Sequence, residues 1–310
     1  MKTRLLTESA EDLHLAAAII TAGGLVAFPT ETVYGLGGDA LNPNASALIY
    51  EAKGRPSDNP LIVHLAHPSE ASLLAEELPE SFAMLAERFW PGPLTLVVKK
   101  KAAVPDATTG GLPTVALRIP DNAAALELIR LAQTPIAAPS ANLSGHPSPT
   151  RWEHVRDDLD GRIDAIITGH PSRVGIESTV LDLTSQVPLI LRPGLVTPEE
   201  IQDALGFPVA YDPAILSAPD PQAVPRAPGM KYRHYAPRAE MILFKGPSDA
   251  VARAIEERRL QAEAAGRAVG TLLYGQAEKH LVARDFFSRL REMDETGADL
   301  ILAAAVSEED

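Results

Sequence analysis

Two cations and a run of hydroxyl groups are the first side chains in the sequence that could do chemistry together. Lys53 and Arg55 flank one glycine, and they follow a stretch of threonines, a glutamate, a tyrosine and the glycines at positions 35, 37 and 38. Arginine can bind a phosphate or carboxylate with two parallel hydrogen bonds, and lysine acts as a compact point charge. The pattern favours a site for a polyanionic ligand, although a plain surface loop with two solvated cations fits it as well.

Short apolar runs that alternate with helical patterns predict the elements that position these groups. The predicted strands are residues 25–28, 61–65, 94–98, 114–119, 135–138, 165–167, 178–183 and 189–191. The predicted helices are residues 10–22 after a Ser9 cap, 44–52, 69–77, 80–89, 122–132, 151–159 after a Thr150 cap, and one that begins at Thr197-Pro198-Glu199-Glu200. This alternation indicates an α/β fold with a mixed or mostly parallel sheet.

Polar segments rich in glycine or proline follow three of the predicted strands, at residues 29–38, 139–149 and 192–194. In open α/β sheets, ligands bind at the carboxyl ends of strands, so these segments form one site if they share an edge. We expect residues 29–38 to be a loop whose glycines expose backbone N–H groups. The polar residues of the second segment are either hydrogen-bond donors to a ligand or simple turn formers: Ser140, Asn142, Ser144 and Ser148.

Arg118 stands near the end of a predicted strand, where a charge needs an explanation. An arginine in such a run is seldom free in a core. We therefore expect it to be paired, bound to a ligand or on the exposed face.

The composition changes after residue 208, where seven prolines fall between residues 208 and 237. Prolines without a periodic pattern are typical of an extended linker. We therefore divide the chain into residues 1–208, a linker or lid over 209–238, and a small β-α-β-α domain over 239–310. The linker carries a basic and aromatic cluster: Arg226, Lys231, Tyr232, Arg233, His234, Tyr235 and Arg238.

Composition excludes several function classes. The chain of 310 residues has no cysteine, which excludes disulfides, thiolate-bound zinc and thiol catalysis. No apolar run suits a signal peptide or a membrane span, so we expect a cytoplasmic protein with no membrane partner. The net charge of −13 argues against a broad nucleic-acid surface. Gly35-x-Gly37-x-x-Ala40 formally matches a dinucleotide fingerprint, but six residues separate it from the strand, so a dehydrogenase is a weak alternative.

Six ordered segments carry a resemblance that spans nearly the whole chain. They read P-T-E-T-V-Y-G-L-G, K-x-R-P-x-x-N-P-L, W-P-G-P-L-T, P-S-A-N-x-S-G, E-S-T-V-x-D and R-P-G. Together they resemble the YrdC/Sua5 family of threonylcarbamoyl-AMP synthases, and the linker sequence P-G-M-K-Y-R-H-Y-A-P is similar to that of its longer, Sua5-type members. The resemblance implies a YrdC-like twisted, open, mixed sheet flanked by helices, plus a small Rossmann-like α/β domain. Longer members are expected to carry a little more helix at the C-terminus.

The resemblance also implies a nucleotidyltransferase reaction. L-threonine, bicarbonate and ATP would give threonylcarbamoyl-adenylate and pyrophosphate, the adenylate being the donor for N6-threonylcarbamoyladenosine at position 37 of tRNA. Such chemistry needs positioning and charge neutralisation more than a protein nucleophile. Mg²⁺ would arrive with ATP, since the sequence offers no dedicated metal ligands. Transfer to tRNA would involve a separate transferase complex.

The same resemblance assigns individual residues. Threonine would be held by Thr32, His64, Arg118, Ala138 and Ser178. ATP would be held by Arg55, Asn59, Thr114, Ser140, Ser148, Arg192 and Tyr235. Lys53, beside Arg55, is expected to face the phosphates, and these two cations are the candidate catalytic residues. Because Tyr235 lies in the linker, we expect the linker to cover the nucleotide and exclude water.

Two other readings stay open beside the dehydrogenase. The YrdC-like fold is also typical of an RNA-binding module with a concave basic face, so weak RNA binding is one alternative. A related domain that forms a carbamoyl-adenylate from carbamoyl phosphate is the other, and the Sua5-type tail disfavours it.

Overall fold

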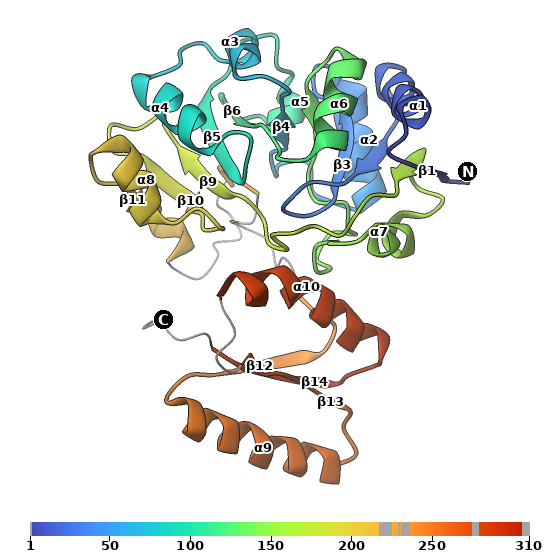
Figure 1. Cartoon of the computed structure of the whole chain (residues 1–310), viewed down its shortest axis with the longest axis vertical. Coiled ribbons are helices and arrows are strands. Elements are labelled where there is room, and N and C mark those ends of the chain that lie inside the picture. Colours follow the sequence, from blue (N-terminus) through green and yellow to red (C-terminus); the bar gives the residue numbers. More distant parts are fainter. Residues whose placement is uncertain (1, 217–224, 229, 231–235, 275–278, 306–310) are drawn as a thin grey trace.

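The larger of two sheets forms the frame of the molecule (Figure 1). The computed structural model describes residues 2–216, 225–228, 230, 236–274 and 279–305. Within them the large sheet has the strand order β1-β8-β2-β3-β7-β4-β6-β5-β9-β10-β11. Its strands are β1 (Arg4–Leu6), β2 (Val26–Phe28), β3 (Gly35–Asp39), β4 (Ile62–His64), β5 (Leu94–Lys99), β6 (Thr114–Arg118), β7 (Ile136–Ala137), β8 (Ala165–Ile167), β9 (Thr179–Asp182), β10 (Leu189–Arg192) and β11 (Ala210–Tyr211). Parallel and antiparallel pairs both occur, which confirms the mixed sheet.

Two apolar clusters lie on opposite faces of this sheet. In β2, Val26 and Phe28 belong to one cluster and Ala27 to the other, as the alternation of side chains along a strand requires. One face is covered by α1 and α6, and the other by α2, α4, α7 and α8. The helices are α1 (Ala10–Thr21), α2 (Pro43–Lys53), α3 (Ala71–Leu74), α4 (Glu80–Phe89), α5 (Asp106–Thr109), α6 (Ala123–Ala132), α7 (Trp152–Leu159) and α8 (Pro198–Leu205), with short 3₁₀ turns η1 (Pro68–Glu70) and η2 (Pro213–Ile215).

Local signals account for several helix ends. The Ser9 side chain accepts a hydrogen bond from the Asp12 backbone and begins α1, and Thr197 forms a capping box with Glu200 at the start of α8. Both predicted starts are confirmed. The helix predicted over residues 69–77 is wrong in length, because η1 and the single turn of α3 replace it. The Thr150 cap is wrong by one residue: Arg151 stands at the N-cap of α7 in extended backbone conformation, without a side-chain cap hydrogen bond.

The glycine run is a strand, which corrects the expected loop over residues 29–38. Gly35–Asp39 forms β3, which pairs antiparallel with both β2 and β7. A Cβ at Gly37 would lie 2.7 Å from the Phe28 ring and 2.8 Å from Ile136. These glycines therefore allow neighbouring side chains to approach the backbone closely, a recognised use of glycine in strands.

The second sheet belongs to the C-terminal part and has three parallel strands, β12 (Glu240–Phe244), β14 (Leu300–Ala304) and β13 (Val269–Leu272), in that order. The predicted β-α-β-α pattern missed β14, which is the central strand. Helix α9 (Ser248–Ala264) covers one face. Helix α10 (Lys279–Glu295) covers the other and lies between this sheet and the large one (Figure 1). Among the described helices, none is long and apolar enough to cross a membrane.

Candidate active site

A polar cleft opens where several strands of the large sheet end. Its empty volume, including the open mouth, is about 630 Å³. The lining combines cations, hydroxyls, amides and one described carboxylate, which suits a charged ligand. The residues lining it are Thr30, Thr32, Val33, Gly35, Lys53, Arg55, Ile62, His64, Arg118, Ala138, Pro139, Ser140, Asn142, Ser144, Gly145, Glu177, Ser178, Arg192 and Pro228.

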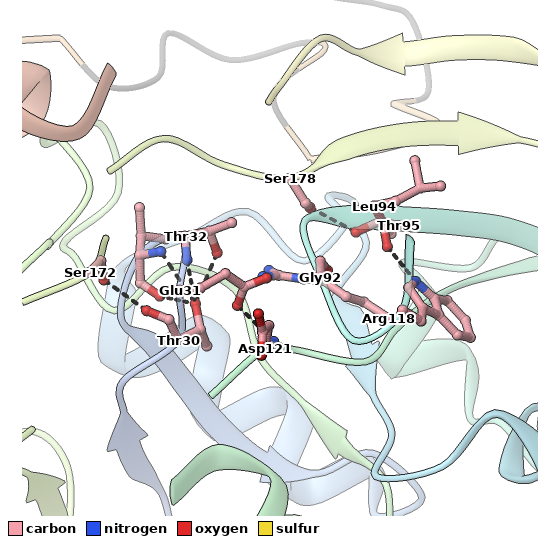
Figure 2. Close-up of polar contacts among 12 residues, drawn as sticks. Thr30, Glu31, Thr32, Gly92, Leu94, Thr95, Arg118, Asp121, Ser172 and Ser178 are labelled. Carbon is pink, nitrogen blue, oxygen red and sulfur yellow. Dashed lines mark hydrogen bonds and ion pairs between the residues drawn. The ribbon is translucent and has the colours of Figure 1, made fainter. Parts of the chain in front are cut away.

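One side of the cleft, here called the Arg118 side, is formed by Thr32, His64, Arg118, Ala138 and Ser178. Arg118 lies at the end of β6, where its Nη2 donates to Glu31 Oε1 at 2.6 Å and its Nε to the Gly92 carbonyl at 3.1 Å. The other oxygen of Glu31 accepts from the Asp121 backbone (Figure 2). The guanidinium is thus paired, one of the three outcomes expected for it, and it still borders the cleft.

A compact turn presents Thr32 beside this ion pair. Thr30 Oγ1 donates to the Val33 carbonyl at 2.6 Å and accepts from the Thr32 backbone at 3.2 Å, while Ser172 Oγ binds the Thr30 carbonyl (Figure 2). The two threonine hydroxyls are 2.9 Å apart. The turn is therefore fixed by its own hydrogen bonds before any ligand arrives.

His64 ends β4 and is neutral at physiological pH. Burial, with the Arg118 charge beside it, lowers its pKa to about 3. Its ring meets Phe28 edge to face, with centroids 6.1 Å apart. Its Nδ1 has no hydrogen-bond partner among the described residues, although the side chain is only 3% exposed. Because a buried polar atom without a partner is costly, it points to a ligand atom at this position.

Ser178 and Arg192 close the Arg118 side from β9 and β10. Ser178 Oγ lies 2.7 Å from Thr95 Oγ1, and Arg192 Nη2 reaches both the Ser178 hydroxyl, at 3.1 Å, and its carbonyl, at 2.9 Å. Antiparallel pairing of β9 with β10 brings these residues together. Arg192 therefore holds Ser178 in place while its guanidinium borders the cleft.

The opposite side, called the Lys53 side, is formed by Lys53, Ser140, Asn142, Ser144 and Gly145. The Lys53 ammonium donates to the carbonyls of Ser140, at 2.5 Å, and Asn142, at 2.6 Å. Burial and the nearby Arg55 charge lower the pKa of Lys53 well below its usual range. Lys53 thus holds the segment after β7 and also borders the cleft.

Glu177 is a cleft residue that the sequence predictions missed. Ser148 Oγ donates to its Oε1. Burial raises the pKa of the Glu177 carboxyl, although Arg192, Ser148 and Lys53 act in the opposite direction. A sequence signal did exist, because Glu177 opens the E-S-T-V segment directly before Ser178. The pattern alone predicts only the strand over residues 178–183.

The structure places most of the predicted site residues around one cleft. Nine of them line it: Thr32, Lys53, Arg55, His64, Arg118, Ala138, Ser140, Ser178 and Arg192. Asn59, Thr114 and Ser148 are not in the lining, although Ser148 contacts Glu177. Both polar side-chain atoms of Asn59 are buried and lack partners among the described residues. Tyr235 lies outside the residues that the structure describes.

The chemistry available here is charge neutralisation and positioning. Four basic side chains, several hydroxyls and one carboxylate are among the described residues that line the cleft. Within the described part of the chain there is no group of three or more His, Cys, Asp or Glu residues that could hold a metal ion. A lining of basic side chains and hydroxyls suits the positioning of a phosphoryl-linked group.

Comparison with known proteins agrees with this geometry. The family model Sua5_yciO_yrdC, described as "Telomere recombination", matches residues 18–194. The model of the threonylcarbamoyl-AMP synthase C-terminal domain matches residues 196–310. The chain is 50% identical to the threonylcarbamoyl-AMP synthase of Pyrococcus abyssi, over 96% of this chain and 89% of the relative. It is 46% identical to that of Bacillus subtilis, over 93% and 86%.

Solved structures give the same result. P. abyssi Sua5 complexed with L-threonine matches with a TM-score of 0.94 and 48% identity, over 99% of this chain and 93% of that one. Escherichia coli YciO, at 23% identity, shares the fold with a TM-score of 0.57 over 64% of this chain. The chain belongs to the Sua5/YciO/YrdC family, in the form that carries the threonylcarbamoyl-AMP synthase C-terminal domain.

Proposed function

We propose that this chain makes threonylcarbamoyl-AMP and pyrophosphate from L-threonine, bicarbonate and ATP. The observation that carries the proposal is the cleft. It combines four basic side chains with a neutral His64, whose Nδ1 has no partner among the described residues, and with a single described carboxylate, Glu177. Relatives with nearly full-length similarity are named for this product. The product would serve tRNA modification through a separate transferase, and this role implies a cytoplasmic location.

Threonine would occupy the Arg118 side. Its carboxylate would bind the Arg118 guanidinium, which Glu31 already orients at 2.6 Å. His64 Nδ1 and the hydroxyls of Thr32 and Ser178 would satisfy its remaining polar groups. An arginine held by a second charge loses little side-chain freedom when a ligand binds, which favours binding.

ATP would occupy the Lys53 side, with Ser140 and Ser148 near its phosphates and Asn59 and Thr114 farther out. Arg192 would reach the phosphates from the Arg118 side. Arg55 Nη2 already donates to the carbonyls of Asn59 and Pro60, at 3.3 and 3.0 Å. Lys53 and Arg55 would act as catalytic cations that offset the charge developing on the leaving pyrophosphate. Mg²⁺ would enter bound to the ATP phosphates, because cleft residues supply one carboxylate rather than a metal cage.

The reaction needs an uncharged threonine amine, and Glu177, which lines the cleft, would take its proton. Its raised pKa makes the carboxylate a better base than an ordinary glutamate. The amine would then attack the carbon of bicarbonate, water would leave, and a carbamate would form. A carbamate oxygen would attack the α-phosphorus of ATP, and pyrophosphate would leave with the electrons of the broken P–O bond. The enzyme forms no covalent bond itself, and its contribution is alignment.

The linker would cover the nucleotide. Its described flanks already contact the catalytic part: Arg226 pairs with Asp182 and Asp212, Pro228 borders the cleft, and the Ala236 backbone donates to the Gly145 carbonyl at 3.1 Å. Tyr235 belongs to the stretch between these contacts and lies outside the residues that the structure describes. Such a cover would protect a mixed anhydride from water.

The test is pyrophosphate release from ATP by the purified chain. Release should require both L-threonine and bicarbonate, and Lys53→Ala should lower its rate by a factor of about 100 or more. Arg259→Ala, on the exposed face of α9, is the matched cation control and should leave the rate unchanged. Release that ignores threonine would mean a different adenylate, and RNA binding without release would mean a binding module.

A further inference from the structure

A buried arginine from the C-terminal part reaches the wall of the cleft. Arg291 lies on α10 and is 7% exposed. Its Nε and Nη2 donate to the Pro147 carbonyl at 3.0 and 2.6 Å, and Nη2 also binds Asp158 Oδ2 at 2.7 Å. These partners are 144 and 133 residues away in sequence. The contact therefore joins two parts of the chain that no local element connects.

Asp158, the ion-pair partner of Arg291, also binds residues 143 and 146, which belong to a segment beside the cleft. It lies on α7, its Oδ2 accepts from the Leu143 backbone at 3.1 Å, and its Oδ1 lies 3.2 Å from His146 Nδ1. Burial alone would raise the pKa of Asp158, but the hydrogen bond and charge of Arg291 hold it below its ordinary value. Arg291 thus favours the ionised form of this carboxylate, which accepts both contacts.

Residues 143–148, held by Asp158 and Arg291, form part of the Lys53 side. Ser144 and Gly145 line the cleft, and Ser148 Oγ binds Glu177. From the cleft interior, the Asn142 side chain donates to the carbonyls of Leu143 and His146, at 2.8 and 2.9 Å. The segment has little regular structure of its own, so these side chains determine where it lies.

Helix α10 is seated close to the cleft through other contacts as well. Val33, beside Thr32, packs in one apolar cluster with Leu272, Phe287 and Leu290. Gly175, whose backbone N–H binds the Thr32 carbonyl at 3.0 Å, faces the helix so closely that a Cβ would lie 2.2 Å from the Arg284 carbonyl oxygen. Figure 1 shows α10 as the element of the C-terminal part that faces the large sheet.

Packing alone does not require a guanidinium at this position. Burying a charge costs several kcal/mol unless its hydrogen bonds and partner repay it, and an apolar side chain would fill the same space without that cost. An arginine does supply a planar fork that fixes the direction of its partners. Because Arg291 binds both the Pro147 carbonyl and the Asp158 carboxylate, we interpret its role as fixing the position of these two groups.

We propose that Arg291 is a positioning residue for the nucleotide: through Pro147 and Asp158 it holds residues 143–148 where they contact ATP, so the C-terminal part completes the active site. This rests on the proposed function for the identity of the nucleotide. Arg291 does not line the cleft and acts only through these partners. Its loss should weaken ATP binding and leave threonine binding, on the Arg118 side, unchanged.

The experiment compares Arg291→Ala, Arg291→Lys and Arg284→Ala in the full chain. Arg284 is the matched control, because it lies on the same helix and its exposed side chain pairs with the adjacent Asp285. Equilibrium binding of a fluorescent ATP analogue and calorimetry with threonine give the two affinities without turnover. Arg291→Ala should raise the Kd for the ATP analogue about tenfold, while the threonine Kd and both Kd values of Arg284→Ala stay within about twofold.

Arg291→Lys keeps the charge but loses the fork, so it should fall between wild type and Arg291→Ala. If Arg291→Ala does not fold, the ATP and threonine affinities of Arg291→Lys decide whether Arg291 positions the ATP-binding segment. Equal losses of ATP and threonine binding, or unchanged ATP binding in a folded Arg291→Lys and Arg291→Ala, would overturn the proposal. If wild type binds the ATP analogue but releases no pyrophosphate with threonine, the proposed function fails while these binding results still decide the role of Arg291.

Discussion

The two sides of the cleft are held in place by different means. On the Arg118 side, the ion pair of Arg118 with Glu31 and the turn at Thr30 lie within the large sheet and its immediate loops. On the Lys53 side, residues 143–148 depend on Asp158 and on Arg291, which comes from the other sheet's helix. Both sides contact α10, but the Arg118 side meets it only by packing at Val33 and Gly175, whereas the Lys53 side is tied to it by the Arg291 ion pair and hydrogen bonds.

This difference suits the two ligands of the proposed reaction, a small amino acid and a larger nucleotide. A preformed pocket binds a small substrate with little loss of entropy. A wall shared with a second domain can open when that domain moves, which lets a larger nucleotide enter and its product leave. If the two sides are independent in this way, variants on one side should leave ligand binding on the other unchanged.

The ion pair of the Arg118 side should be costly to break. Glu31→Gln keeps the shape of the side chain but leaves the buried Arg118 guanidinium without a counter-charge. We expect the free energy of unfolding, measured with urea, to fall by about 3–5 kcal/mol, with loss of threonine binding. Glu127→Gln breaks an exposed pair with Arg130 and should cost at most about 1 kcal/mol. Equal, small losses in both variants would mean that Arg118 is not held by Glu31.

Glu177 lies between the two sides and should control the rate. Glu177→Gln should lower kcat about 100-fold at neutral pH, because an amide cannot take the proton of the threonine ammonium. In wild type, kcat should fall on acidification at a pH above the usual 4.5 of a glutamate, since burial raises this pKa and protonation removes the base. Pyrophosphate release measured across pH checks both statements.

The same pH series separates a base from a structural carboxylate. If Glu177 is the base, the variant should recover activity as the solution becomes alkaline enough to deprotonate threonine without help. A defect of equal size at every pH would assign Glu177 to holding Ser148 only. Threonine affinity, measured alongside, should change little in the variant.

The sequence predicted most strands and helices of this molecule better than it predicted the side-chain contacts between them. Fully apolar runs such as residues 61–65 and 94–98 were predicted as strands because burial on both faces leaves that pattern. β3 was missed because its glycines carry no side chains to show a period, and they were interpreted as a ligand loop instead. β14 was missed because a short apolar run does not by itself distinguish a strand from a helix segment.

Site contacts were hard to predict for a related reason. Motif resemblance named the residues around the cleft, but it did not show that Arg118 pairs with Glu31, 87 residues away. Nor could it show Lys53 bound to carbonyls of residues 140 and 142, or Arg291 beside Pro147. These pairings arise from strand order and domain docking, which periodicity and local spacing do not encode.

The smallest expected effect concerns His64, which either binds the ligand or only packs in the core. Two buried histidines, His64 in the cleft and His154 on α7, both have pKa values lowered to about 3, from an ordinary 6.5, mainly by burial. Between these values the unfolded chain binds a proton that the folded chain does not. Stability is therefore complete above about pH 6.5 and falls on acidification, by at most about 1.4 kcal/mol per pH unit for each histidine.

Replacing either histidine with glutamine should reduce that slope by the same amount in urea unfolding between pH 4 and 6. Only His64→Gln should also weaken threonine binding, because its Nδ1 lacks a protein partner among the described residues, whereas His154 bonds to Thr150 and Arg151. Calorimetry at pH 7, where both wild-type rings are neutral, isolates this difference from charge. If the two variants bound threonine equally well, His64 would be a core residue of the Arg118 side, and the ligand contacts there would be left to Arg118 and the hydroxyls.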